Sequence, residues 1–165
     1  MEAERRNPYR ISSRSTESLL DAVNLRILRE LEGDARLPVA TLARRVGMSA
    51  PAVGERLTRL GEAGVVRGFG VELDPAALGL PVQAFVRLRP SPGRLPRMAR
   101  VAEESPEVLS CDRVTGEDCF VARVAVRDLA HLEEVLDRFL LHGQTTTSIV
   151  QSSPVPWRQP PLPGD

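Results

Sequence analysis

One stretch of this 165-residue chain combines several arginines with few acidic residues. Residues 36–59 contain five arginines and one acid, a local charge of +4, although the formal net charge of the whole chain is zero. Guanidinium groups bind phosphate and form paired hydrogen bonds with guanine, so this stretch has the chemistry of a DNA-binding surface. The residues expected to contact DNA are Arg44, Arg45, Ser49, Ala50, Ala52, Glu55, Arg56, Thr58 and Arg59.

These residue types suit different parts of a DNA site. Arg44 and Arg45 are expected to meet phosphate, with a solvated helix face as the alternative. Glu55 can accept a hydrogen bond from cytosine, and the methyl groups of alanine and threonine can contact thymine. Arg56 has two equal interpretations, which could coexist: a contact with DNA, and a structural pair with Glu55, Asp34 or a backbone carbonyl inside the domain.

A thiol-dependent enzyme is one alternative to a DNA-binding protein. Cys119 lies beside Asp118, and His131 or His142 could supply a base. However, Cys119 belongs to a strand pattern, where thiols usually serve packing, and a solvated helix face explains His131. The sequence has no phosphate loop, dinucleotide fingerprint or metal-ligand spacing. We therefore predict no catalysis, no metal and no cofactor, and we expect Cys111 and Cys119 to be reduced thiols.

The DNA-facing residues require short helices to position them. Apolar residues recur every three or four positions over residues 39–46 and 50–63, and a glycine-containing turn separates the two runs. Ser49 can cap the second helix by accepting a backbone hydrogen bond. A preceding helix over residues 22–32, capped by Asp21, would complete a small core. The pattern predicts a three-helix head with a helix-turn-helix, whose second helix can enter a DNA major groove.

Regular apolar patterns continue in the second half of the chain. The expected order is a strand at 82–89, a helix at 94–104, strands at 107–115 and 119–126, a helix capped by Asp128, and a strand at 145–152. This βαββαβ order predicts a ferredoxin-like α+β domain, with two helices on one face of an antiparallel sheet. The other face, with Phe85 and Val121, would stay partly bare, so we expect the domain to dimerise.

Composition divides the chain into five segments. We expect a disordered arm over 1–17, a helix-turn-helix domain over 18–64, a β ribbon or linker over 65–80, the βαββαβ domain over 81–153 and a proline-rich tail over 154–165. No apolar run approaches the roughly 20 residues of a membrane helix. The first residues also lack the apolar segment of a secretory signal, so a cytoplasmic protein is expected.

Several short motifs follow one another in a specific order from Leu20 to about Val150. They are Leu20-Asp21, Ile27-Leu28, Asp34 with Arg36, Leu42-Ala43, Val46-Gly47-Met48-Ser49, Val53, Arg56, Leu60, Gly64-Val65-Val66, Gly68-Phe69, Leu73-Asp74-Pro75, Leu78-Gly79, Pro106-Glu107-Val108, Val114-Thr115-Gly116 and 145–150. The ordered set resembles the Lrp/AsnC family of bacterial transcription regulators. The resemblance implies a winged helix-turn-helix head, joined by a β ribbon to the family's ligand-binding RAM domain.

The resemblance also implies an effector site at the hairpin over residues 115–120. An amino acid is a zwitterion, so its ammonium group seeks carboxylates and its carboxylate seeks hydroxyl or backbone N–H donors. The residues alone leave two plainer explanations open, an ordinary turn for the hairpin and β propensity for the threonines. The expected effector residues are Thr115, Gly116, Glu117, Asp118, Thr145, Thr146 and Thr147.

The chain departs from the family pattern in two places. Asn24 stands where the family usually has a second aspartate, and Asp118 and Cys119 occupy the aromatic and second acidic positions of the hairpin. The resemblance implies three partners: double-stranded DNA, an amino-acid effector bound between RAM domains, and further copies of the chain. The copies would form a homodimer, and possible larger assemblies are a tetramer or an octamer of dimers. The resemblance also implies that the protein is associated with the nucleoid. A DNA-compacting protein that senses no ligand is the remaining alternative.

Overall fold

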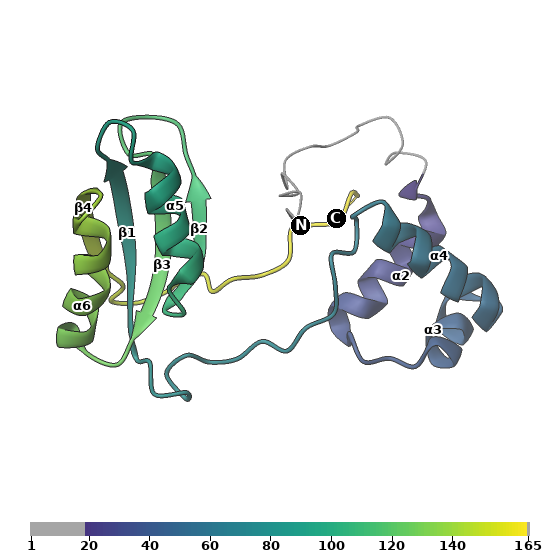
Figure 1. Cartoon of the computed structure of the whole chain (residues 1–165). Coiled ribbons are helices and arrows are strands. Elements are labelled where there is room, and N and C mark those ends of the chain that lie inside the picture. Colours follow the sequence, from purple (N-terminus) through teal and green to yellow (C-terminus); the bar gives the residue numbers. More distant parts are fainter. Residues whose placement is uncertain (1–18, 165) are drawn as a thin grey trace. The chain divides into compact units, whose positions relative to one another are not determined.

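The computed structural model describes residues 19–164, and its helices and strands divide between two units (Figure 1). The first unit comprises the described residues up to Val71, together with the C-terminal segment from Trp157. The second comprises Glu72–Pro156. The chain therefore passes from one unit to the other inside the expected linker, and each unit is described by itself.

The first unit contains three helices: α2 (Ala22–Gly33), α3 (Val39–Val46) and α4 (Ala50–Glu62). The side chain of Asp21 accepts a hydrogen bond from the backbone N–H of Asn24 at 2.7 Å, and Ser49 accepts one from Ala52 at 3.4 Å. Both expected N-caps are thus confirmed. Gly47, with a φ of 74°, makes the left-handed turn between α3 and α4 that a larger residue would resist.

A small apolar core joins the three helices of this head. Ile27 of α2, Leu42 and Val46 of α3 and Val53 of α4 are buried together. This burial explains why the first helix is needed, because α3 and α4 alone would leave their apolar sides exposed to water. Val39, the first residue of the apolar pattern over residues 39–46, is exposed because it begins α3 at the edge of the head.

The segment that was expected to be a β ribbon or wing has no strand. Residues 65–81 form turns and extended chain without a hydrogen-bonded ladder. A strand requires a neighbouring strand for its backbone groups, and the single chain places none beside this segment. Its apolar side chains Phe69, Val71 and Leu73 are consequently exposed.

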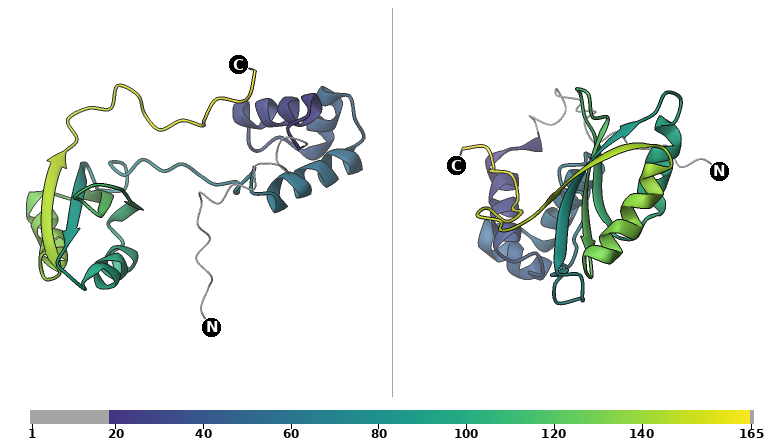
Figure 2. Two further views of the ribbon diagram at one scale, coloured as in Figure 1. Left: turned by 90° about the horizontal axis from the view of Figure 1, so that it is seen from above. Right: turned by 90° about the vertical axis from the view of Figure 1, so that its left-hand side faces the viewer.

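The second unit has the expected βαββαβ order. Its elements are β1 (Val82–Pro90), α5 (Leu95–Glu104), β2 (Val108–Arg113), β3 (Phe120–Val126), α6 (Leu129–Leu140) and β4 (Gly143–Ile149). All strand pairs are antiparallel, and the order across the sheet is β2-β3-β1-β4. Both helices cover the same face of the sheet (Figure 2). This is the ferredoxin-like arrangement.

The two faces of the sheet differ in burial. Val86 and Leu88 of β1 pack against Met98 of α5 and Phe139 of α6, and all four are fully buried. Phe85, which directly precedes Val86, points to the opposite face and is 46% exposed. The alternation of β1 therefore confirms one covered face and one bare face in the single chain.

The last strand begins earlier than expected, at Gly143, and ends at Ile149. Gly143 pairs with Pro90, and a Cβ atom at this position would collide with the carbonyl oxygen of Arg89. Only glycine therefore allows β4 to begin there. The residues after β4 form neither helix nor strand up to residue 164, and the expected N-terminal arm lies outside the described residues. No helix between residues 19 and 164 is long and apolar enough to cross a membrane.

Candidate functional site

The outward side of α4 carries the residues expected to read DNA. The side chains of Glu55 and Arg59 are 72% and 65% exposed, and their charged atoms lie 4.0 Å apart. Such an exposed pair is weak, so both groups remain available to a ligand. Ser49 and Thr58 are also exposed, whereas Ala50 and Ala52 are partly buried. This surface therefore combines hydrogen-bonding, charged and methyl groups.

Arg44 and Arg45 end α3 but differ in their partners. Arg44 is exposed and donates to the hydroxyl of Thr41, on the preceding turn, at 3.2 Å. Arg45 forms an ion pair of 2.6 Å with Glu30 of α2, and its carbonyl accepts a hydrogen bond from Arg26. Arg44 is thus the freer of the two for phosphate, and Arg45 also joins α3 to α2.

Arg56 points toward α2 rather than outward from the head. Its Nη1 donates to Asp21 Oδ2 at 2.7 Å and to Asn24 Oδ1 at 3.0 Å. The hydrogen bond from Arg56 is the main reason that the pKa of Asp21 is lowered. The structural interpretation of Arg56 therefore applies, but its partners are neither Glu55 nor Asp34. The N-cap pattern identified Asp21 from sequence, but it did not reveal this second role.

Gly54 lies in the middle of α4, where glycine is unfavourable relative to alanine. A Cβ atom built at Gly54 would meet nothing within 4 Å, so close helix packing in the single chain does not explain it. The carbonyl of Gly54 accepts a hydrogen bond from the hydroxyl of Thr58 at 3.1 Å. The Thr58 hydroxyl is therefore occupied within the helix, which leaves its methyl group for contact with a base.

The hairpin over residues 115–118 joins β2 to β3 and is held by arginines that sequence reasoning missed. Glu117 Oε2 lies 2.6 Å from Arg89 Nη2, and Asp118 Oδ1 lies 3.5 Å from the same nitrogen. Arg87 Nε lies 3.9 Å from Asp118 Oδ2. The alternation of β1 placed both arginines on the bare face, but only the pairing of β1 with β3 brings them beside the hairpin. Gly116, with a φ of 109°, makes the turn.

The three threonines of β4 do not share one face of the sheet. Thr145 pairs with Leu88 and Thr147 pairs with Val86, so both point toward the helix-covered face. Thr146 pairs with Arg87 and is exposed on the bare face. The structure therefore brings only Thr146 to the side on which Arg87 contacts the hairpin.

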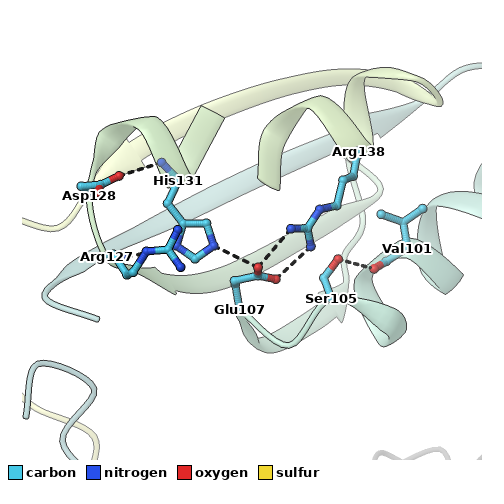
Figure 3. A network of polar contacts seen from close by, with 7 residues as sticks. All are labelled: Val101, Ser105, Glu107, Arg127, Asp128, His131 and Arg138. Atoms are coloured by element: carbon cyan, nitrogen blue, oxygen red, sulfur yellow. Dashed lines mark hydrogen bonds and ion pairs between the residues drawn. The ribbon is translucent and has the colours of Figure 1, made fainter. Parts of the chain in front are cut away.

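A buried carboxylate, Glu107, joins the beginning of β2 to α6 (Figure 3). Arg138 donates to its two oxygens at 3.0 and 3.1 Å, and His131 Nε2 lies 3.0 Å from Oε1. The backbone N–H of Arg127 donates to His131 Nδ1 at 3.3 Å, so the ring has a partner at each of its nitrogens. The hydrogen bonds from Arg138 are the main reason that the pKa of Glu107 falls from 4.5 to about 2.

The expectation of a solvated His131 is therefore wrong. Asp128 caps α6 by accepting the backbone N–H of His131, and the ring is buried against Glu107. The partner lies 24 residues away in sequence. Helical periodicity therefore could not reveal it.

The two cysteines are free thiols. Cys111 pairs with Ala122 across the β2–β3 ladder rather than with Cys119. Burial, assisted by the charge of Asp112, raises the pKa of Cys111 to about 11, so its reactive thiolate is disfavoured at neutral pH. Between residues 19 and 164, no group of three or more His, Cys, Asp and Glu side chains could hold a metal ion.

Family models match both units. The model for the AsnC-type helix-turn-helix domain covers residues 20–60, and that for the Lrp/AsnC ligand binding domain covers residues 83–160. The HTH-type transcriptional regulator LrpC of Bacillus subtilis is 29% identical over 133 residues, which span 81% of this chain and 92% of that protein. LrpA, the HTH-type transcriptional regulator of Mycobacterium tuberculosis, is 38% identical over 120 residues, which span 72% of this chain and 80% of that protein.

A solved structure has the same fold throughout most of its length. The feast or famine regulatory protein of M. tuberculosis, complexed with L-methionine, aligns with a TM-score of 0.79 and 33% identity. The alignment covers 87% of this chain and 99% of that one. The relatives compared are named as regulators rather than as enzymes. The chain belongs to the Lrp/AsnC family of transcriptional regulators.

Proposed function

We propose that this regulator binds double-stranded DNA as a homodimer or a larger assembly of dimers. In this proposal, an amino acid or related small metabolite bound between RAM domains changes that assembly and so the spacing of the heads. The observation that carries the proposal is a complete helix-turn-helix head on the same chain as a Lrp/AsnC ligand binding domain. Because a protein that reads DNA works where the DNA is, we expect this regulator in the cytoplasm, at the nucleoid.

The proposed DNA contacts come from α4 and the end of α3. Arg59, Glu55 and Ser49 would meet base edges, because their side chains are exposed on the outward side of α4. Arg44 would meet phosphate. Arg45 can contribute only by sharing its guanidinium with Glu30. Two such heads would present paired recognition helices to a two-fold symmetric site.

The proposed effector contacts combine both signs of charge on one side of the sheet. Glu117 and Asp118 would accept from the ammonium group of an amino acid, and Arg87, Arg89 and the Thr146 hydroxyl would donate to its carboxylate. The effector would have to displace the exposed ion pair between Arg89 and Glu117, which is worth about 0–1 kcal/mol. The L-methionine complex of the M. tuberculosis relative supports an amino acid as the ligand class.

The proposed dimer would cover several exposed apolar side chains of the single chain. They include Phe85 on the bare face of the sheet and the linker side chains Phe69, Val71 and Leu73. A second copy of the linker would also supply the neighbouring strand that residues 65–81 lack. Pairing of two chains would thus form the expected β ribbon and would also cover the bare face of the sheet.

Light scattering with and without a panel of amino acids tests assembly and effector response together. We expect a dimer or multiple of dimers, and at least one amino acid that changes its size or its thermal stability. Footprinting on genomic fragments tests DNA reading in parallel. Discrete footprints would support a regulator, whereas uniform coverage without a response to any amino acid would favour the DNA-compacting alternative.

A further inference from the structure

We propose that Arg56 is a positioning residue for DNA reading. It acts through Asp21 to fix α4 against α2 and does not contact DNA itself. The proposal rests on α4 being the DNA-reading helix, as argued above. It assigns a role to a conspicuous cation of the recognition helix that the helix-turn-helix pattern would otherwise place among the DNA contacts.

The geometry of Arg56 leaves it little freedom to reach a base. Its Nη1 is shared between Asp21 Oδ2 at 2.7 Å and Asn24 Oδ1 at 3.0 Å. Its side chain is 28% exposed, against 65% for Arg59 on the outward side of the same helix. To contact DNA, Arg56 would have to abandon two acceptors, one of which carries a full negative charge.

Both acceptors of Arg56 are held in place by the start of α2. Asp21 Oδ1 accepts the backbone N–H of Asn24 as the N-cap, so the carboxylate uses one oxygen for α2 and the other for α4. Asn24 is 4% exposed, and its Nδ2 donates to the carbonyl of Leu19 at 2.7 Å. A rigid, capped helix end therefore fixes the point to which the middle of α4 is attached.

The position of a recognition helix decides which side chains reach the base edges. A displacement of about 1 Å is enough to break hydrogen bonds that need 2.7–3.2 Å. The tie through Arg56 crosses from α4 to α2, whereas Val53 and Leu57 pack by non-directional apolar contact. Arg56 therefore supplies a directional contact between α2 and α4.

The test compares three variants with the wild-type full-length chain. The probe is a duplex selected by the wild type from a pool of random double-stranded DNA. The variants are Arg56→Met, Asp21→Asn and the double substitution, chosen because asparagine still caps α2 but carries no charge. A positioning role predicts that each single variant loses affinity, by about tenfold for Arg56→Met, and that the double variant loses no more than Arg56→Met.

A direct contact between Arg56 and DNA predicts a different change in DNA affinity for Asp21→Asn. Asp21→Asn removes a negative charge from the head and frees Arg56, so affinity would stay constant or rise. The salt dependence gives a second criterion: Arg56→Met should leave the slope of log K against log salt unchanged, whereas loss of a phosphate contact lowers it by about 1. Arg59→Met, on the outward side of α4, is the matched control and should alter the sequence preference.

Melting curves establish that each variant is folded at the binding temperature. If Arg56→Met is not folded at the binding temperature, Asp21→Asn still tests the positioning role, because the two hypotheses predict different changes in its DNA affinity. The proposal is overturned if Asp21→Asn binds as tightly as wild type, or if Arg56→Met keeps full affinity. If the wild type selects no sequence from the random pool, both the DNA-reading role of α4 and the positioning role of Arg56 are overturned. This outcome is seen with the wild type alone, before any variant is measured.

Discussion

Single residues of the head divide into those that can meet DNA and those that shape the reading helix. Arg59 and Arg56 lie three positions apart on α4, yet one is exposed and the other is bound to Asp21. Sequence types and helical spacing made both of them candidates for DNA contact. The distinction depends on a partner 35 residues away, which local patterns do not contain.

Arg59→Ala is expected to weaken binding to a selected DNA site by about 1–3 kcal/mol without unfolding the head, because its exposed guanidinium has only a weak internal partner. Fluorescence anisotropy gives the affinity, and a melting curve gives the stability. Arg97→Ala, which changes an exposed arginine of α5 in the other unit, is the control and should leave affinity within twofold. Equal effects of the two changes would remove Arg59 from the DNA contacts.

Glu107→Gln is expected to lower the free energy of unfolding at pH 7 by about 2 kcal/mol, because Arg138 loses a buried carboxylate partner. Urea unfolding, followed by circular dichroism, measures the change. Glu104→Gln at the exposed end of α5 is the control and should be within about 0.5 kcal/mol of wild type. A result in which both variants match the wild type would mean that the buried cluster contributes no net stability.

The same carboxyl predicts acid sensitivity with a defined sign. Its pKa is lowered from 4.5 to about 2, so the unfolded chain binds a proton more readily than the folded one. The stabilisation is therefore complete above pH 4.5 and is lost as the pH falls towards 2. Melting temperatures of the wild type should fall more steeply over this range than those of Glu107→Gln. Parallel profiles would contradict the assignment.

At the scale of helices and strands, features set by neighbouring residues were predictable. Asp21, Ser49 and Asp128 were identified as caps from sequence, because a cap acts on backbone groups two or three residues away. Two features that depend on distant partners were not predicted. The linker has no strand in the single chain, and β4 begins at Gly143 because of its contact with Arg89 across the ladder.

Gly143→Ala is expected to destabilise the second unit by about 1–3 kcal/mol, because the new methyl group would push β4 away from the backbone of β1. Gly61→Ala is the matched control. It lies in α4 with no atom near its Cβ position, so it should be neutral or stabilising by up to about 1 kcal/mol. Thermal unfolding of the full chain measures the stability of both variants. If Gly143→Ala is as stable as the wild type, β4 can shift away from β1 without a loss of stability.

The proposed effector site was only partly predictable for the same reason. Turn chemistry predicted the hairpin over residues 115–118, and the family resemblance alone suggested an effector there. Arg87 and Arg89 reach the hairpin through the β1–β3 pairing. The register of the β1–β4 pairing also determines which face of the sheet each threonine is on, because neighbouring residues of a strand point to opposite faces. Thr146 therefore stays on the side of the arginines, and Thr145 and Thr147 do not.

At the scale of the whole molecule, two units with separate cores are joined by an extended linker. Because each unit has its own core, the proposed mechanism lets an effector act on DNA binding through the assembly of several chains. A ligand can shift such an equilibrium only if it binds one assembly more tightly than the other. This requirement makes the bare face of the sheet the central surface of the proposed mechanism.

Phe85→Asp is expected to shift the protein from dimer to monomer, because it places a negative charge on the bare face that the proposed dimer would bury. In the wild type, the centre of the Phe85 ring lies 6.0 Å from the guanidinium of Arg123. Light scattering measures the mass, and DNA affinity should fall with it because two heads no longer act together. Leu129→Asp changes an exposed residue of α6 on the helix-covered side and should leave the mass unchanged. An unchanged mass for Phe85→Asp would exclude this face as the dimer surface.

The two oxygens of Asp21 have a kinetic consequence for the head. One accepts the amide proton of Asn24 and the other binds Arg56 in the middle of α4. The first turn of α2 and the recognition helix therefore belong to one cooperative opening unit, rather than fraying separately. Hydrogen exchange at the amide of Asn24 should accordingly slow when DNA holds α4, although this amide is on a different helix from the residues that face DNA.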